Sequence, residues 1–255
     1  MTVTVSRIGA VTKLVLDAPE RLNAVDTPML DLLEASVRSA GADSDVRVLA
    51  VTGAGRAFCS GGSLGDDGKG GHNLTPATVE AAGRAVSTLL HSPTPTVALV
   101  NGVAAGVGVS IALACDYVLA SDAASFVLAF AKIGLMPDGG ATALVAASIG
   151  RTRALRMAMT GERVSATTAA DWGLISEVVA AQSFEDRAAQ LLAAFEEAAP
   201  LSLARTKAAI NAAALDHDAA LRREEEGQAA LLTSADFVEG VAAFRGKRRP
   251  EFRGV

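Results

Sequence analysis

The feature that most constrains the fold is an alternation of short apolar runs with helical segments in the first part of the chain. Val46–Val51, Thr96–Val100 and Tyr117–Ala120 are almost continuously apolar, which is the pattern of strands buried on both faces of a sheet. Parallel neighbouring strands need long crossover connections, and helices usually supply them. We therefore predict an α/β core built around a parallel sheet.

Two threonine–proline pairs indicate where helices begin. Thr27 and Thr75 each precede a proline, a pattern that predicts a capping threonine followed by proline at the first helical position. We expect the first helix to end at Gly41 and the second near His91. A third helix is expected over Gly106–Cys115, after the strand that ends at residue 100.

After Pro137 the pattern becomes mostly helical. We expect one further strand over Ile175–Val179, and helices over Gly139–Ile149, Arg151–Met159, Ala166–Asp171, Phe184–Ala198 and Leu201–Ala214, with two more between Asp218 and Phe244. Residues 1–199 are predicted to form the α/β core, and residues 200–255 a helical C-terminal region.

Composition excludes several classes of protein. Half of the 255 residues are apolar, too many for a disordered chain. The chain has two cysteines, too few for a disulfide-stabilised scaffold, and we interpret Cys59 and Cys115 as packing residues. A net charge of −5 argues against nucleic-acid binding.

Membrane insertion and secretion are also disfavoured. The longest apolar run, Thr96–Cys115, is interrupted by Asn101, Ser110 and glycines, so strand, turn and helix explain it better than a membrane span does. The N-terminus alternates like a strand and lacks the pattern of a signal peptide. We expect a cytoplasmic protein with no membrane partner.

Motifs typical of nucleotide-binding and hydrolase sites are incomplete. Gly53–Phe58 follows a strand but lacks the third glycine of a dinucleotide fingerprint. Gly108–Ala112 resembles a nucleophile elbow, except that it ends in alanine. His72, His91 and His217 are not spaced like metal ligands, so we interpret them as surface or loop residues and predict no metal site.

Two glycine-rich stretches remain. Arg56–Leu64 follows a buried strand, and Asn101–Val109 leads into an apolar helix. Both place backbone N–H groups next to small residues, and the second places them at a helix N-terminus, where negative charge is favoured. Two converging N–H groups form an oxyanion hole. Glycines that only permit tight turns are the alternative interpretation, and each stretch taken singly favours it.

Four segments in order carry a family resemblance: VTGAGRAFCSGGSL, PTVALVNGVAAGVGVSIALACDYVLAS, ASFVLAFAKIGLMPDGGAT and AADWGLISEV. They closely resemble the crotonase (enoyl-CoA hydratase/isomerase) superfamily, and the resemblance extends from Leu22 to Phe252. It implies an α/β fold, the crotonase-like (ClpP/crotonase) spiral of ββα units, with a C-terminal helical region that forms a homotrimer or a dimer of trimers. It also implies an acyl-CoA thioester substrate, with coenzyme A as part of that substrate and no separate cofactor.

The resemblance implies roles for particular residues. The N–H groups of Gly62 and Val107 would form the oxyanion hole, although many members have glycine at the second position. Ala57, Ser60, Gly62 and Leu64 would line the path of the CoA moiety. Phe244 and Lys247 match a phenylalanine and a lysine that reach the CoA of a neighbouring subunit. Lys247 is equally well explained as part of a solvated basic end.

The chain departs from the family where hydratases activate water. Their two glutamates align with Ser110 and Phe130, and an aspartate common in the first loop aligns with Ser63. Serine and phenylalanine cannot readily activate water.

One carboxylate remains, that of Asp138 in IGLMPDGG. In the enoyl-CoA isomerase branch an acidic residue at this position shuttles a proton. A helix N-cap is the alternative interpretation, and both roles can hold together.

The preferred reaction is the conversion of a 3-enoyl-CoA into a 2-enoyl-CoA. Asp138 would take a proton from C2 and return it at C4, while Gly62 and Val107 hold the enolate. Hydration of a 2-enoyl-CoA in fatty-acid metabolism is the first alternative, with Asp66, Asp67 or Asp138 activating water.

Three further hypotheses stay open. Asp138 could act as a nucleophile, as in chlorobenzoyl-CoA dehalogenases, or the protein could bind acyl-CoA without catalysis. A serine hydrolase acting through Ser110 is the least favoured, because no base is matched to that serine.

Overall fold

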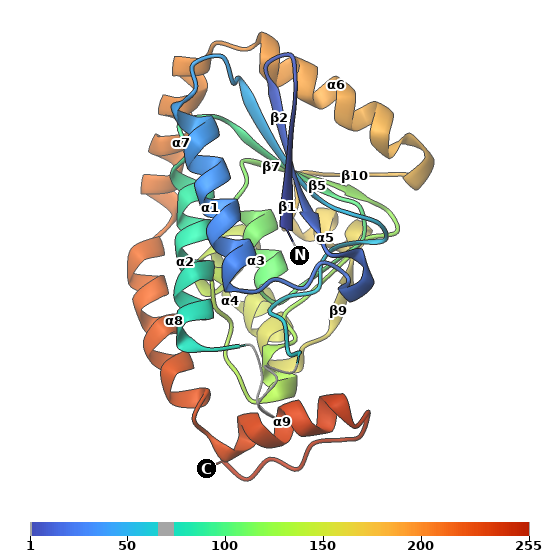
Figure 1. The fold of residues 1–255 in the computed structure, drawn as a ribbon, viewed down its shortest axis with the longest axis vertical. Coiled ribbons are helices and arrows are strands. Elements are labelled where there is room, and N and C mark those ends of the chain that lie inside the picture. Colours follow the sequence, from blue (N-terminus) through green and yellow to red (C-terminus); the bar gives the residue numbers. More distant parts are fainter. Residues whose placement is uncertain (1, 66–73, 255) are drawn as a thin grey trace.

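The computed structural model describes residues 2–65 and 74–254, and its centre is a mostly parallel sheet (Figure 1). The sheet has six strands in the order β1-β2-β3-β5-β7-β10, and only the pair β1–β2 is antiparallel. The strands are β1 (Thr2–Ile8), β2 (Val11–Asp17), β3 (Val48–Gly53), β5 (Thr96–Val100), β7 (Tyr117–Ser121) and β10 (Glu177–Val179). The predicted parallel sheet is confirmed.

A second, smaller sheet was not predicted. It has four strands in the order β4-β6-β8-β9, namely β4 (Ala57–Cys59), β6 (Val103–Ala105), β8 (Ser125–Val127) and β9 (Arg163–Ser165). Each strand has only three residues, and the first two lie inside the glycine-rich stretches. Such short segments carry no measurable periodicity, because a period of two needs several repeats.

The two sheets alternate along the chain. A strand of the large sheet, a strand of the small sheet and a helix follow one another as β3-β4-α2, β5-β6-α3 and β7-β8-α4. The helices are α2 (Pro76–His91), α3 (Val107–Leu113) and α4 (Ala141–Thr160). This repetition is the expected spiral of ββα units, and it brings the ends of β4 and β6 and the beginning of α3 to one place.

Helices cover both faces of the large sheet. On one face, α6 (Phe184–Glu197) packs against β3, β5 and β7 (Figure 1). On the other face lies the main core, which includes residues of α1 (Thr27–Ala42), α2 and α3. Large apolar side chains from both sheets and helices are fully buried there, among them Leu16, Leu30, Phe58, Leu89 and Ile111.

Of the two predicted capping threonines, one is confirmed. Thr75 caps α2, and it also forms a capping box with Thr78. At α1, however, the cap is Asp26, whose carboxylate accepts a hydrogen bond from the N–H of Met29 at 3.1 Å. Thr27 is already helical there, because the residue before it is an equally good capping residue.

The C-terminal region begins with α7 (Pro200–Ala214), next to the predicted boundary at residue 200. It continues with α8 (His217–Leu231), which contacts α2 and α4, and α9 (Ala235–Arg245), which contacts the 3₁₀ helix η2 (Phe130–Ile133). The remaining helices are η1 (Pro19–Arg21), α5 (Ala166–Trp172) and η3 (Ala181–Ser183). Within the described ranges, no helix is both long enough and apolar enough to cross a membrane.

Candidate active site

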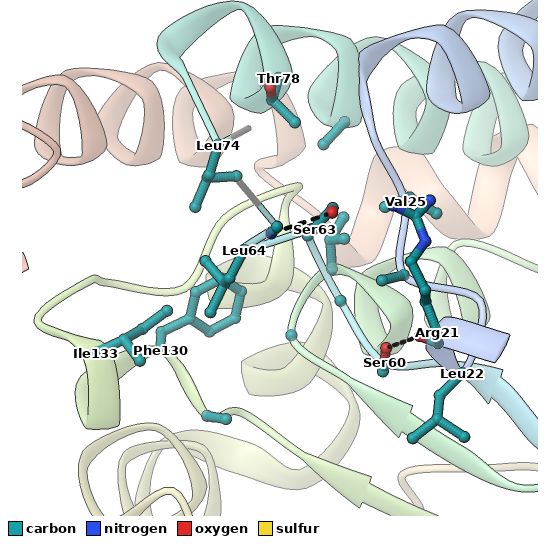
Figure 2. Close-up of a pocket in the computed structure, with 18 of the residues that line it drawn as sticks. Arg21, Leu22, Val25, Ser60, Ser63, Leu64, Leu74, Thr78, Phe130 and Ile133 are labelled. Carbon is teal, nitrogen blue, oxygen red and sulfur yellow. Dashed lines mark hydrogen bonds between the residues drawn. The ribbon is translucent and has the colours of Figure 1, made fainter. Parts of the chain in front are cut away.

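A cavity of about 630 Å³ lies where the glycine-rich stretches meet α2, η1 and η2. Figure 2 shows Leu64, Phe130 and Ile133 on one side of it, and Arg21 and Leu22 on the other. The size is typical of a small-molecule site, and so is a wall that combines many apolar side chains with a few polar groups. The apolar part of the wall includes Leu74, Val79 and Ala82 from the region of α2.

The two glycine-rich stretches are in direct contact. A Cβ atom on Gly61 would lie 3.1 Å from the carbonyl oxygen of Ala105. Residue 62 forms an isolated parallel bridge with Val25. The stretch after β4 is thereby fixed between the chain that precedes α1 and the beginning of α3, and both stretches line the cavity.

Two backbone N–H groups at this contact are available to a ligand. Val25 donates to the oxygen of Gly61 and Ser63 donates to the oxygen of Val25, whereas the N–H of Gly62 makes no such backbone bond to the residues that the structure describes. Val107 is the first residue of α3, so its N–H has no acceptor within the helix. Among residues 2–65 and 74–254, neither N–H donates to a backbone oxygen in a turn, a loop or a cap. Gly62 and Val107 both line the cavity.

Asp138 lines the same cavity, and its carboxyl is buried. Its side chain is 4% exposed, and its Oδ2 accepts a hydrogen bond from Nε2 of Gln228 at 3.0 Å. Its Oδ1 is buried and has no partner among the described residues. Burial raises the pKa of Asp138 to about 7; the Gln228 hydrogen bond opposes this rise, and the negative charge of Glu224 adds to it. Near neutral pH this carboxyl can both accept and donate a proton.

The side chain of Asp138 does not cap α4, so that alternative is wrong. The N-cap residue of α4 is Gly140, which has no side chain that could cap the helix. Glu224 of α8 takes the role instead, accepting from the N–H groups of Gly140 and Thr142 at 2.5 and 2.8 Å. Because a carboxylate from another helix already satisfies these donors, the carboxyl of Asp138 is left for the cavity.

The family resemblance aligns Ser110 and Phe130 with the two glutamates of hydratases. The hydroxyl of Ser110 is fully buried and donates to the backbone oxygen of Asp138 at 2.9 Å, so Ser110 holds the segment that carries the carboxyl. Phe130 presents an apolar ring to the cavity. A Cβ atom on Gly139 would lie 3.2 Å from Val107 Cγ2, which shows how closely the Asp138 segment packs on the first turn of α3.

The residues expected along the CoA path divide into two groups. Ser60, Leu64 and Phe244 line the cavity together with Gly62. Ala57 is fully buried in β4; neither it nor the exposed Lys247 is among the residues that line the cavity. Phe244, which is 63% exposed, lines the cavity of its own chain.

The structure also shows where His217 and the two cysteines lie. His217 was expected on the surface or in a loop, but it is buried at the start of α8 against Gly140. Cys59 and Cys115 are packing residues, as predicted: both are buried in the core, where burial raises the pKa of each thiol to about 12. Asp66, Asp67 and His72 lie outside the described residues.

Two polar residues of this region were missed. Glu224 and Gln228 lie one helical turn apart on a face of α8 that is buried against the Asp138 segment. The sequence carries a weak indication, since two polar residues at this spacing share one side of a helix. Nothing in the sequence shows that this side faces inward.

Comparison with known proteins identifies the family. The family model described as Enoyl-CoA hydratase/isomerase matches residues 7–255. The chain belongs to the enoyl-CoA hydratase/isomerase family. It is 38% identical to the 1,2-epoxyphenylacetyl-CoA isomerase of Escherichia coli, over 96% of this chain and 95% of that protein. It is 40% identical to a probable enoyl-CoA hydratase of Rhodobacter capsulatus, over 94% and 93%.

Solved structures of family members agree with this fold. An enoyl-CoA hydratase from Mycobacterium avium subsp. paratuberculosis superposes with a TM-score of 0.93 at 43% identity, over 98% of both chains. The protein is therefore a crotonase-fold enzyme of acyl-CoA metabolism. In the part of the chain that the structure describes, His, Cys, Asp and Glu side chains form no group of three or more that is suited to a metal ion.

Proposed function

We propose that this enzyme moves the double bond of a 3-enoyl-CoA to give the 2-enoyl-CoA, with Asp138 as the proton shuttle. The observation that carries the proposal is the setting of Asp138: the residue lines the cavity, its carboxyl is buried, and Oδ1 has no partner in the described residues. A carboxyl whose pKa lies at about 7 is matched to taking and returning a proton at neutral pH.

The reaction requires two proton transfers and no added reactant. Ionised Asp138 takes a proton from C2, and the electron pair of that C–H bond moves into the thioester to form a dienolate. The N–H groups of Gly62 and Val107 stabilise its oxygen; one such donor contributes about 3–4 kcal/mol. The Asp138 O–H bond then breaks as the proton passes to C4, which leaves the double bond between C2 and C3.

The cavity wall supports isomerisation over hydration. Water addition needs a group that orients and deprotonates water. The hydroxyl of Ser110 is instead bound to the backbone oxygen of Asp138, and Phe130 is apolar. The oxygens of Glu224 accept hydrogen bonds from Gly140 and Thr142.

Two relatives are named as isomerases, the Escherichia coli protein and a trans-2-decenoyl-[acyl-carrier-protein] isomerase of Streptococcus mutans that is 30% identical.

Hydration of a 2-enoyl-CoA is the second candidate. It is favoured by the 43% identity to a structure described as an enoyl-CoA hydratase. In that reaction Asp138 would deprotonate water for attack at C3 and return a proton at C2, with the same two N–H groups on the thioester oxygen.

The CoA moiety is proposed to lie along the mouth of the cavity. Ser60, Leu64 and Phe244 line the cavity beside Gly62, so the pantetheine would pass between the glycine-rich stretch and the ring of Phe244. Lys247 lies just beyond the end of α9 and would approach the phosphates, while Ala57 would contribute through its backbone.

Absorbance of the conjugated enoyl thioester separates the two reactions. Isomerisation of a 3-enoyl-CoA creates this chromophore, so absorbance rises, whereas hydration of a 2-enoyl-CoA removes it. We expect the rise with 3-enoyl-CoA and little loss with 2-enoyl-CoA. A fast loss with 2-enoyl-CoA and no rise with 3-enoyl-CoA would establish the hydratase instead.

A further inference from the structure

Two buried side chains of α8 hold the segment that carries Asp138. Glu224 accepts hydrogen bonds from the N–H groups of Gly140 and Thr142 and from the Thr142 hydroxyl. One turn later, Nε2 of Gln228 donates to Asp138 Oδ2 at 3.0 Å. Glu224 and Gln228 are 1% and 0% exposed. Glu224 of α8 therefore fixes the beginning of α4, and Gln228 of the same helix fixes the carboxyl of Asp138.

The Gln228 hydrogen bond makes the two oxygens of Asp138 unequal. Nε2 of Gln228 donates in this contact, so Asp138 Oδ2 is the acceptor. A hydrogen on Oδ2 would point at another donor and would find no acceptor there. Oδ1 has no partner in the described part of the chain. When the carboxyl is protonated, its hydrogen is therefore placed on Oδ1.

We propose that Gln228 is a positioning residue, which holds Asp138 Oδ2 and so makes Oδ1 the atom that takes the proton from C2 and returns it to C4. This inference rests on the proposed isomerisation. Gln228 is not among the residues that line the cavity, so it acts through Asp138. Without its donor the carboxyl could rotate, and either oxygen could carry the proton in an orientation that does not face the substrate.

Among the described residues, the titratable groups near this segment include Glu224, His217 and Lys132, and a Gln228 variant leaves them in place. Glu224 lies on α8, and burial raises its pKa. His217 packs against Gly140, and burial lowers its pKa. Lys132 reaches the cavity from η2. A changed pH profile in a Gln228 variant therefore reports on the lost hydrogen bond.

The test is the pH profile of kcat/KM for a 3-enoyl-CoA in Gln228→Met, which keeps the side-chain length and removes the donor. A hydrogen bond to the ionised form favours that form, so its loss should move the midpoint of the profile upward by about one pH unit and reduce kcat/KM at pH 7 about fivefold. The loss should largely disappear at pH 9. The matched control is Gln190→Met, at an exposed position of α6.

A second variant keeps the inference falsifiable if Gln228→Met does not fold. Gln228→Leu also removes the donor and leaves no polar atom at this position, so its midpoint should rise as in Gln228→Met. A folded variant of either kind with a wild-type midpoint would overturn the inference, even if its rate were lower at every pH, since a uniform loss indicates a structural role only.

The inference and the proposed function fail in different ways. If Asp138→Asn retains isomerase activity, the proposed function is wrong. If Asp138→Asn is inactive and a folded Gln228→Met enzyme behaves like the wild type, the shuttle stands and only the role of Gln228 is wrong. Affinity for a saturated acyl-CoA should stay the same in Gln228→Met, because Gln228 does not line the cavity.

Discussion

In an unfolded chain the Asp138 carboxyl would titrate near its ordinary pKa of 3.8, whereas burial raises the pKa to about 7 in the folded protein. Between pH 3.8 and pH 7 the carboxyl is ionised in the unfolded chain but still protonated in the folded protein. The free energy of unfolding therefore falls as the pH rises through this range. Above pH 7 the loss is complete, and it amounts to about 4 kcal/mol if the whole difference in pKa is expressed. The geometry that suits Asp138 for catalysis therefore destabilises the fold.

The variant Asp138→Asn should be more stable than the wild type, and increasingly so at higher pH. Asparagine keeps the shape and an acceptor for Gln228 but never ionises. Between pH 5 and pH 8 we expect its stability advantage to grow by about 3 kcal/mol, measured by urea unfolding. A difference between the two proteins that is the same at both pH values would show that Asp138 is not the group responsible.

The sequence could indicate Asp138 but not its surroundings. Asp138 lies in a motif that resembles the isomerase branch, so its position in the chain was informative. Gln228 and Glu224 come from a helix about 90 residues further along, and only the folded chain brings them to Asp138. The same reason explains why His217 was wrongly expected at the surface: its burial depends on α8 docking against Gly140.

Among the elements, α3 packs closely on β4 at the site. A Cβ atom on Gly108, in the first turn of α3, would lie 2.5 Å from the backbone oxygen of Cys59. A real Cβ cannot approach so closely, so a side chain here must push the helix away from the small sheet. The N–H of Val107 belongs to the residue just before and would move with it.

We expect Gly108→Ala to lower the free energy of unfolding by about 1–3 kcal/mol and to lower kcat more than the affinity for a saturated acyl-CoA. Gly83→Ala in α2 is the matched control, since its Cβ would lie 3.4 Å from the nearest atom and alanine is the better helix former. Chemical unfolding and steady-state kinetics measure both effects. Equal stability of the two variants would contradict the close contact.

The helices and the strands of the large sheet were mostly predicted well, and the three-residue strands of the small sheet were not. The strands β3, β5 and β7 and the helices α2, α6 and α7 lie within two residues of the expected ranges, because each has enough residues to show a period or a capping signal. The short strands β4, β6 and β8 were missed. Their pairing is set by the neighbouring ββα unit, so the local sequence carries little information about it.

At the scale of the whole molecule, the C-terminal region closes over the site of its own chain. Helix α8 holds the Asp138 segment, and Phe244 of α9 lines the cavity. Arg245 donates to the backbone oxygens of Leu64 and Gly65 at 3.0 and 3.2 Å. The predicted division at residue 200 therefore separates two parts of the chain that build one site.

Helix α7 suggests how chains would associate. None of its residues is buried within the chain, and Leu201 and Ile210 are 80% and 59% exposed. We expect a homotrimer or a dimer of trimers, with three or six times the chain mass by light scattering, and we expect Ile210→Glu to shift the mass toward one chain. A wild-type protein that stays monomeric at micromolar concentration would contradict this assembly.

The central claim is that one carboxyl carries the proton in this reaction. Its most direct test is the rate of 2-enoyl-CoA formation from 3-enoyl-CoA by wild type and Asp138→Asn, with acyl-CoA affinity measured on the same preparations. General acid–base groups contribute about a hundredfold to ten-thousandfold, so we predict a kcat at least about a hundredfold lower and an unchanged affinity. An Asp138→Asn enzyme that is folded, binds acyl-CoA and forms 2-enoyl-CoA at the wild-type rate would contradict the single-carboxylate shuttle.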